Sequence, residues 1–412
     1  MLNTMRKTNH LQRALLVLII SFLTCFNAYG FGFFNKHTDK EDVVEQRETN
    51  RREYAPRERL SHEIRQIAIL LPLTGQHAEA GVAIREGFLA GYYANPMQHK
   101  PNIRVYDTTR GDVQRVYETA IQEGADFIVG PLSKEDVLRI GRMGRQLQVP
   151  VLALNNHPEL YQAPANFVMY TLAPETEAEQ IAERAWEKGY RSASIVVPDN
   201  AWGKRTAGAF NARWQQLGGK IIRSVFANPS QDQAAAVRRL LGIDESQKRA
   251  NDIKNLLKEK VEFKARRQDV DVIVMAAPPA QARQLKPLFD FYYAEDVPVL
   301  ATSSIYSGSQ NPRSDRDVNG VVFCDMPWLL DANKGASLRQ LLNRDGEEHS
   351  DQYGRLFAMG YDAYNLTNQI RVLQGRGNYA GATGNLHLGN NNQIVRNLSW
   401  AKMVDGIATQ IN

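Results

Sequence analysis

The sequence predicts an α/β protein built from two doubly wound parallel-sheet units in tandem. Three observations support this prediction: continuous apolar runs rich in β-branched residues, amphipathic stretches between them, and a second copy of the same alternation later in the chain. Continuous apolar strands separated by helices are typical of a parallel sheet that is covered on both faces. A chain of 412 residues, 43% hydrophobic and 23% charged, is long enough for about two domain-sized cores.

The first alternation covers residues 63–172. Its apolar runs predict strands over residues 67–71, 103–107, 126–129 and 149–154. Apolar residues at helical spacing predict helices over residues 78–94, 113–123 and 134–148. These elements alternate as they do in a doubly wound unit, where helices cover both faces of one sheet.

The second alternation covers residues 173–302. Its expected strands are residues 192–197, 220–226, 271–276 and 298–301. Its expected helices are residues 176–189, 202–217, 230–241 and 280–293. A strand over residues 321–325 and a long helix over residues 353–373 follow. Alternating residues on both sides of residues 389–392 predict a β-hairpin at the end of the chain.

Residues 1–30 predict a signal peptide, and therefore export. Three basic residues precede an apolar run over residues 14–26, which is shorter than the roughly 20 residues of a transmembrane helix. Two ways of processing stay open. The small residues Ala28 and Gly30 support cleavage after Gly30, whereas lipid modification would make Cys25 the first residue of the mature chain.

Residues 31–62 predict a charged, flexible tether. Between Lys36 and Arg65 the chain carries eight basic and eight acidic residues with few apolar ones, so this segment cannot bury a core. The net charge of +5 comes from 50 Lys and Arg against 45 Asp and Glu, and this excess is too small to indicate a nucleic-acid partner. Cys324 is the second of two cysteines and is expected to be a buried thiol.

A basic, amphipathic segment over residues 245–269 interrupts the second alternation. Four apolar residues share one helical face there, namely Ile253, Leu256, Leu257 and Val261. One interpretation is a solvated helix that packs on its domain through this stripe. The other is a docking surface for an acidic partner. Its candidate residues are Lys254, Lys258, Arg266 and Arg267.

A ligand site is expected in the loops that follow the strands, because open α/β sheets bind ligands beyond the carboxyl ends of their strands. Thr74 and Gly75 lie in the turn after the first strand, and Ser133 begins a predicted helix. Each of these positions also has a structural interpretation, since glycine permits turns and Ser or Thr caps helices. The other candidates for the cleft are Asn155, Asn200 and Tyr306.

Motifs of catalysis and cofactor binding are missing from the sequence. It contains no phosphate-binding loop, no nucleophile elbow and no dinucleotide fingerprint after its first strand. None of the eight histidines has a second His or Cys at metal-ligand spacing. We therefore expect no metal, no cofactor and no enzyme activity, although an enzyme whose site is assembled from distant residues is a third class to test.

Several segments carry a resemblance to a known family. These are "LLPLTGQHAEAGVAIREGFLAGYY", "VGPLSKEDV", "VPVLALN" and "DVNGVVFCDMPWLL", together with the long stretch from "ARRQDVDVIVMAAPP" to "ATSSIYSG". They resemble the C-terminal domain of the penicillin-binding-protein activator family LpoA. The resemblance implies a type I periplasmic binding protein-like fold, with two lobes joined by three crossovers. Lobe one would be residues 63–172 with 303–373, and lobe two residues 173–302 with 374–412.

The resemblance also implies a function. Such a protein is a non-catalytic periplasmic regulator that activates a class A penicillin-binding protein, a peptidoglycan synthase, by direct binding. It further implies an anchor at the inner face of the outer membrane, with Cys25 as the lipidated residue. The alternative is a solute-binding receptor that holds amino acids or short peptides in its cleft and feeds a transporter. Larger members carry a helical-repeat domain where this sequence has the charged tether.

Overall fold

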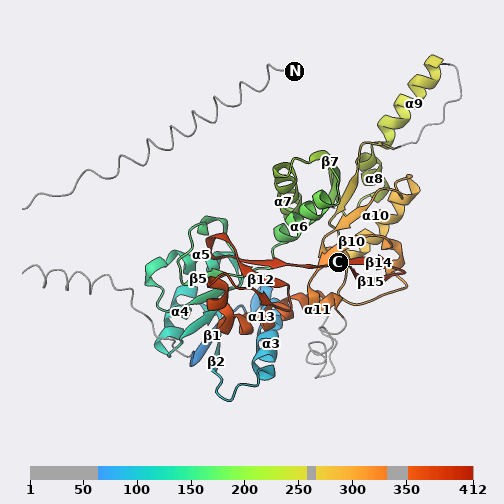
Figure 1. Ribbon diagram of the computed structural model, residues 1–412. Helices are drawn as coiled ribbons and strands as arrows, with labels where there is room; N and C mark the ends of the chain where they lie inside the picture. The colour runs from blue at the N-terminus through green and yellow to red at the C-terminus, as the bar shows by residue number, and fades with distance from the viewer. Residues whose placement is uncertain (1–63, 258–265, 332–350, 412) are drawn as a thin grey trace, which may run out of the picture. The chain divides into compact units, whose positions relative to one another are not determined.

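The computed structural model describes residues 64–257, 266–331 and 351–411 (Figure 1). Within these residues the first sheet has five parallel strands. Their order is β2 (Asn102–Asp107), β1 (Gln66–Leu71), β3 (Phe127–Val129), β4 (Val151–Ala153) and β5 (Phe167–Met169). All six residues of β1 are buried, because strands pair with both of its edges and helices cover both of its faces.

Successive side chains of β1 enter two different cores. Ile67 and Ile69 pack with α3 (Ala78–Ala94) and α13 (Asp351–Gln374) on one face of the sheet. Ala68 and Leu70 pack on the opposite face with α4 (Val113–Gln122) and α5 (Lys134–Arg142). This division follows from the two-residue period of a strand.

Helices α3 and α13 lie side by side, and their backbones touch (Figure 1). A β-carbon on Gly87 of α3 would overlap the carbonyl oxygen of Phe357. In return, a β-carbon on Gly360 of α13 would overlap the carbonyl oxygen of Ile84. Glycine is therefore required at both positions by the close approach of the two helices.

Replacing either glycine of this contact should destabilise the protein. Gly87→Ala and Gly360→Ala each force the helices apart, and we expect each to lower the free energy of unfolding by about 1–3 kcal/mol, as overpacking does. Gly208→Ala in α7 is the matched control, since a β-carbon there meets no atom within 4 Å. The control should raise the unfolding free energy by about 0.5–1 kcal/mol. Urea denaturation measures all three, and equal effects would contradict the assignment.

The second sheet has seven strands among the described residues. Their order is β15 (Ile407–Ile411), β14 (Ser399–Val404), β10 (Val322–Asp325), β9 (Val299–Ala301), β8 (Val272–Met275), β6 (Ser192–Pro198) and β7 (Lys220–Ala227). The strands from β10 to β7 are parallel, whereas β14 and β15 add an antiparallel edge. Helices α6 (Pro174–Glu187) and α7 (Ala201–Gln216) pack on one face, and α8 (Gln233–Leu241) and α10 (Pro279–Phe291) on the other.

Helix α9 (Ile243–Leu257) follows α8 and extends away from α8 and α10 (Figure 1). Cys324 of β10 is fully buried in the core under α6 and α7, and burial raises the pKa of its thiol well above the usual value. The buried thiol predicted from the sequence is confirmed. Among the described residues, no helix is both long and apolar enough to cross a membrane.

A third, antiparallel sheet consists of β11 (Tyr379–Ala380), β12 (Asn385–Leu388) and β13 (Ile394–Asn397). Its hairpin between β12 and β13 is the one predicted around residues 389–392. A second hairpin, β14 and β15, comes after it, so the predicted hairpin does not end the chain.

The prediction of two largely parallel α/β sheets is confirmed, and the chain passes between them three times, after β5, after β10 and after β13. Two expected boundaries lie elsewhere. The one at residue 303 was placed too early, because β10 pairs with β9 in the second sheet. The one at residue 374 was also too early, since Leu386 and Ile394 are buried in the first sheet's core. The assignment of the remaining residue ranges to two lobes stays a prediction.

Candidate functional site

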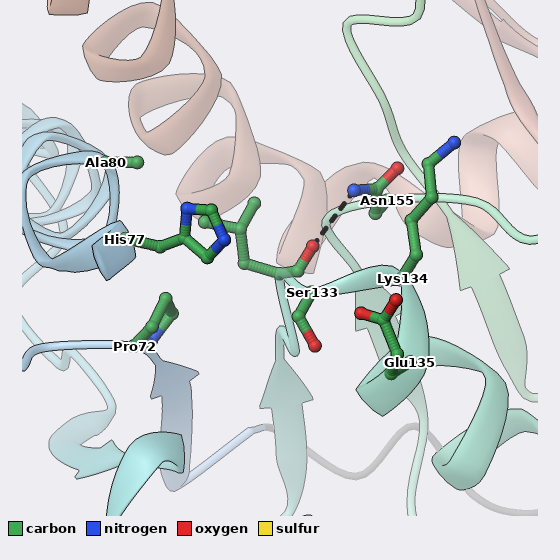
Figure 2. A pocket seen from close by; sticks show the side chains of 8 residues that line it. Pro72, His77, Ala80, Ser133, Lys134, Glu135 and Asn155 are labelled. Carbon is green, nitrogen blue, oxygen red and sulfur yellow. Dashed lines mark hydrogen bonds between the residues drawn. The ribbon is translucent and has the colours of Figure 1, made fainter. Parts of the chain in front are cut away.

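The carboxyl ends of β1, β3 and β4 meet at one edge of the first sheet, and the segments that follow them enclose a cavity of about 280 Å³ (Figure 2). This volume is near the lower end of the roughly 300–1,000 Å³ of small-molecule pockets. Eight residues line it: Pro72, His77, Ala80, Leu132, Ser133, Lys134, Glu135 and Asn155. The expected location beyond the strand ends is therefore where a cavity is found.

Ser133 and Asn155 are the two predicted cleft residues that line this cavity. The Ser133 hydroxyl accepts a hydrogen bond from the backbone N–H of Asp136 (3.1 Å), so its interpretation as the cap of α5 is confirmed. The Asn155 side chain donates to the carbonyl oxygen of Leu132 (3.0 Å) and accepts from the N–H of Asn156 (2.9 Å). Both side chains thus hold their own loops, and a ligand contact by either stays a prediction.

Thr74 and Gly75 stand beside the cavity without lining it. Gly75 has φ +74°, a left-handed conformation that favours glycine, as the turn interpretation requires. Thr74 makes no capping bond to the short turn over Gly75–His77, so the cap interpretation of Thr74 is wrong. Its hydroxyl instead donates to Oδ2 of Asp107 at 2.9 Å.

Asp107, at the end of β2, holds the turn that follows β1. Its carboxylate accepts hydrogen bonds from the backbone N–H groups of Leu73 (3.0 Å) and Thr109 (3.1 Å). It also accepts from the hydroxyls of Thr74 (2.9 Å) and Thr109 (2.7 Å). Burial by itself raises the pKa of Asp107, but the hydrogen bonds outweigh it and hold this pKa well below the usual range.

Asp107→Asn should destabilise the fold at neutral pH by about 1–3 kcal/mol, because an amide cannot accept all of these bonds. The folded-state pKa lies below the unfolded value of about 3.9, so the stabilisation is present above that value and is lost as the pH falls through the folded pKa. The difference in free energy of unfolding between wild type and variant, measured by urea denaturation, should narrow below about pH 4.

Asp199→Asn is the control for this prediction, since among the described residues the exposed Asp199 carboxylate pairs only with Lys204, at 3.3 Å. Exposed ion pairs contribute about 0–1 kcal/mol. If the difference in free energy of unfolding between wild type and Asp107→Asn does not depend on pH, ionisation of Asp107 is not the source of the stabilisation.

Asn200 and Tyr306 are not part of the cavity. Asn200 caps α7 by accepting a hydrogen bond from the N–H of Gly203 (2.8 Å). The Tyr306 ring is buried in the second sheet's core, 5.6 Å from the Phe323 ring between centroids. Of the six predicted cleft residues, the structure therefore brings together only Ser133 and Asn155 around the cavity.

His77, Lys134 and Glu135 line the cavity and were not predicted to do so. The motif "GPLSKED" places Lys134 and Glu135 directly after Ser133, at the start of the predicted helix, and this position is the signal that could have found them. Within the described part of the chain, none of these three side chains has a hydrogen-bond or ion-pair partner. A catalytic base and its nucleophile are oriented by such partners. The arrangement suits the binding of a small polar molecule, and no group of residues placed to hold a metal occurs in residues 64–257, 266–331 or 351–411.

The predicted partner-binding residues separate into three kinds. Lys254 is exposed on α9, and Lys258, like the lipidation candidate Cys25, lies outside the described residues. The prediction that Arg266 binds a partner is wrong, because its side chain is buried and pairs with both carboxylate oxygens of Asp296 (2.5 and 2.6 Å). Arg267 is partly exposed and pairs with Asp269 at 2.5 Å.

The predicted packing of α9 through its apolar stripe is wrong for Leu256, which is 81% exposed. Ile253 is half-buried, so the stripe is covered only in part among the residues that the structure describes. The helix leaves an apolar side chain in water beside exposed cations.

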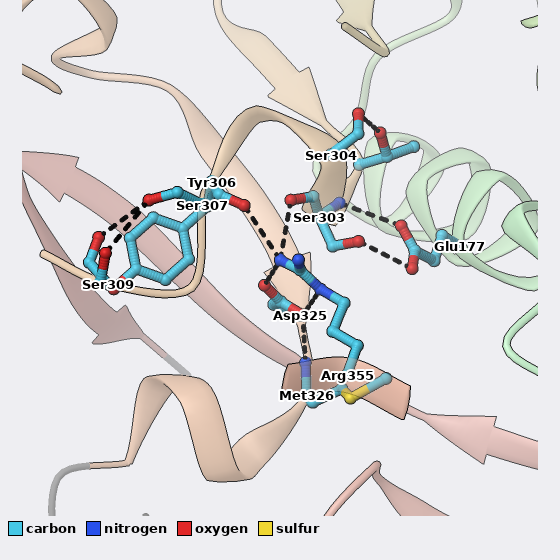
Figure 3. Close-up of polar contacts among 10 residues, drawn as sticks. Glu177, Ser303, Ser304, Tyr306, Ser307, Ser309, Asp325, Met326 and Arg355 are labelled. Carbon is cyan, nitrogen blue, oxygen red and sulfur yellow. Dashed lines mark hydrogen bonds and ion pairs between the residues drawn. The ribbon is translucent and has the colours of Figure 1, made fainter. Parts of the chain in front are cut away.

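Buried charges join the elements at the second passage between the sheets (Figure 3). Arg355 of α13 pairs with Asp325 at the end of β10, through Nη2 to Oδ2 (2.6 Å) and Nε to Oδ1 (3.2 Å). Its Nη2 also donates to the carbonyl oxygens of Ser303 (3.2 Å) and Tyr306 (3.0 Å). The Asp325 side chain is 1% exposed and that of Arg355 is 21% exposed, so the carboxylate is the fully buried partner.

Two further buried carboxylates lie beside the same passages. Glu177 of α6 accepts from the N–H (3.0 Å) and the hydroxyl (2.9 Å) of Ser303, and burial raises its pKa. Asp362 of α13 accepts from the N–H (2.8 Å) and hydroxyl (2.7 Å) of Thr383 and from the Tyr170 hydroxyl (3.3 Å). Burial raises the pKa of Asp362 as well. Hydrogen bonds to buried carboxylates thus link segments that are far apart in the sequence.

Arg355→Ala should lower the free energy of unfolding by about 3–5 kcal/mol, because it leaves the buried Asp325 carboxylate without its cation. Arg205→Ala is the control, since it breaks an exposed pair with Glu175 and should change the unfolding free energy by about 0–1 kcal/mol. Urea denaturation at neutral pH measures both. Similar losses for the two variants would contradict a special role for the buried pair.

Comparison with known proteins agrees with this fold. A family model described as "LppC putative lipoprotein" matches residues 60–406. The chain belongs to the LppC family. The resemblance found in the sequence is thereby confirmed, since curated relatives of this LppC chain are named penicillin-binding protein activator LpoA.

Two of these relatives show the extent of the match. The LpoA protein of Photobacterium profundum is 31% identical over 350 residues, which are 83% of this chain and 56% of the relative. That of Vibrio antiquarius is 30% identical over 346 residues, 81% of this chain and 56% of the relative. The LppC chain therefore spans about half the length of the curated relatives it matches.

Solved structures resemble the same region. The LpoA (YraM) C-domain from Haemophilus influenzae, described as a regulator of PBP1A, is 27% identical with a TM-score of 0.65, over 84% of this chain and all of that one. A putative branched-chain amino acid ABC transporter protein from Chromobacterium violaceum is 26% identical with a TM-score of 0.63, over 82% of this chain and 99% of that one. The likeness to both kinds of protein confirms the type I periplasmic binding protein-like fold of this LppC family member.

Proposed function

We propose that this chain is a non-catalytic regulator that activates a class A penicillin-binding protein, a peptidoglycan synthase, by direct contact. The observation that carries the proposal is the match to proteins named penicillin-binding protein activator LpoA, at about 30% identity over more than four fifths of the chain. The C-domain structure described as a regulator of PBP1A is covered in full by the same region.

The contacts of the described residues support a regulator over an enzyme or a receptor. The cavity beyond the first sheet has no oriented pair of catalytic groups, as shown above for its lining residues. A receptor closes around its ligand by movement at the passages between its lobes. Here a buried ion pair with additional hydrogen bonds, Arg355 to Asp325, occupies the second passage. The receptor alternative rests on likeness of fold and is not favoured by the named relatives.

We also propose an envelope location for the chain. The description of the family as putative lipoproteins supports a lipid anchor, for which Cys25 is the candidate residue. Residues 31–62 would then act as a charged tether between that anchor and the folded unit that begins at Ile64. Mass spectrometry of the mature N-terminus distinguishes acylation of Cys25 from cleavage after Gly30.

Synthase assays test the regulatory proposal. Glycan polymerisation and peptide cross-linking by a purified class A penicillin-binding protein are measured with increasing amounts of this chain. We expect the rate of at least one reaction to rise and then to saturate as the complex forms. Absence of both binding and any change in rate would sink the proposal.

A thermal-shift screen with amino acids and muropeptides is the companion control. A receptor saturated at a hundredfold excess over its Kd gains about 2.7 kcal/mol of stability. We expect no stabilisation of that size with any of these ligands. Such a shift without an effect on the synthase would replace the regulator by the receptor.

A further inference from the structure

Three of the five most exposed large apolar side chains in the described part of the chain belong to two neighbouring segments. Leu256 lies on α9, whereas Phe291 and Tyr293 lie at the end of α10 with 71% and 62% of their surface exposed. Phe291 and Tyr293 lie two residues apart, and exposed apolar side chains that gather in one region mark interaction sites more often than isolated ones do. Aromatic residues in particular are enriched among the anchors of protein interfaces.

The backbone at the end of α10 is strained at one of these aromatic residues. Tyr293 has φ +61°, in the left-handed region, where a residue other than glycine is disfavoured. The position ends the helix, with the N–H of Tyr293 bonded to the carbonyl of Asp290 (3.0 Å) and that of Ala294 to Phe289 (2.9 Å). Glycine would suit this turn better. Because the Tyr293 side chain is mostly in water, its packing in the fold does not offset the strain.

Arg266 holds this turn in place. Its Nε donates to the carbonyl oxygen of Tyr293 (2.5 Å), and its Nη2 binds both carboxylate oxygens of Asp296. Arg266 is only 5% exposed, whereas the Asp296 side chain is 57% exposed. The Phe291 ring meets the Tyr292 ring edge to face, 5.0 Å between centroids. The backbone that carries Tyr293 and the ring of Phe291 are therefore held by contacts within the fold, which lowers the entropy lost on binding.

Helix α9 begins beside this turn and carries unpaired cations. In its first turn, Asp244 pairs with Arg238 and Glu245 pairs with Arg223. The backbone N–H of Arg267 donates to the carbonyl oxygen of Leu241 (3.0 Å), just before α9 begins. The later cations of α9, Lys248, Arg249 and Lys254, have no ion-pair partner among the described residues. Asp252 is the one acidic residue among them. The exposed part of α9 is thus complementary to an acidic surface.

We propose that these two segments form the surface through which the chain contacts its synthase. The α9–α10 surface consists of Lys248, Arg249, Lys254, Leu256, Phe291 and Tyr293. It fits an acidic face of the class A penicillin-binding protein that offers apolar pockets for the two aromatic rings and for Leu256. This assignment rests on the proposed function and deepens it by naming the surface that acts.

The test measures the affinity of full chains for a purified class A penicillin-binding protein. The first variant combines Phe291→Ser with Tyr293→Gly, and the second is Lys254→Glu. We expect the double variant to weaken binding by about tenfold or more, as the loss of interface anchors does. Tyr293→Gly alone should weaken binding while leaving thermal stability unchanged or raised, because glycine relieves the strain. If Tyr293 had only a structural role, Tyr293→Gly would not weaken binding while leaving thermal stability unchanged or raised.

Matched controls carry the same chemical changes elsewhere. Tyr93→Ser combined with Tyr161→Ser removes two similarly exposed aromatic rings around the first sheet. Lys188→Glu reverses an exposed charge at the C-cap of α6. These should bind like wild type.

If wild type binds and the α9–α10 variants bind equally well, the surface is wrong and the regulatory function stands. If wild type does not bind, both proposals fall. Sedimentation that shows a dimer of this chain, broken by the same variants, would make the surface a self-interface and overturn the assignment.

Discussion

The buried ion pair between Arg355 and Asp325 is the contact on which the joint between the two sheets depends. Asp325 ends β10, the last strand before the chain leaves the second sheet, and Arg355 stands on the helix that packs against the first. A carboxylate in that position needs its cation, because an uncompensated buried charge is strongly destabilising. The same guanidinium also binds two carbonyl groups of the loop after β9. One side chain thus connects three segments that are distant in the sequence.

This constraint bears on function because it limits which parts of the molecule are available for binding. The passages between the sheets are occupied by buried carboxylates and their hydrogen-bond donors, and the cavity at the first sheet is small, with its Ser133 and Asn155 atoms already bonded. Helix α9 carries cations without an ion-pair partner among the described residues, and the end of α10 carries exposed aromatic rings. A receptor scaffold with these properties is better suited to presenting a surface than to closing on a ligand.

Elements with strong periodicity could be predicted from the sequence, whereas long-range contacts could not. The helix expected at residues 78–94 is α3, with the same bounds, and β1 differs by one residue. Strand β5 is not predicted because no α-helix separates it from β4, so the alternation of strands and helices does not mark it. Helix α5 ends early where Gly144 turns with φ +57°. Polar residues after strands predicted a site, yet Tyr306 lies in the core. Asp107 and Arg355 act through partners that no local pattern identifies.

The central claim is that this chain acts by surface contact with a synthase and without a ligand in its cavity. Hydrogen exchange of the full chain, with and without a purified class A penicillin-binding protein, tests it most directly. The account predicts slower amide exchange in α9 and at the end of α10 on complex formation, and unchanged exchange in the turn after β1 and the start of α5. Protection confined to these cavity-lining segments, or no protection anywhere, would contradict it.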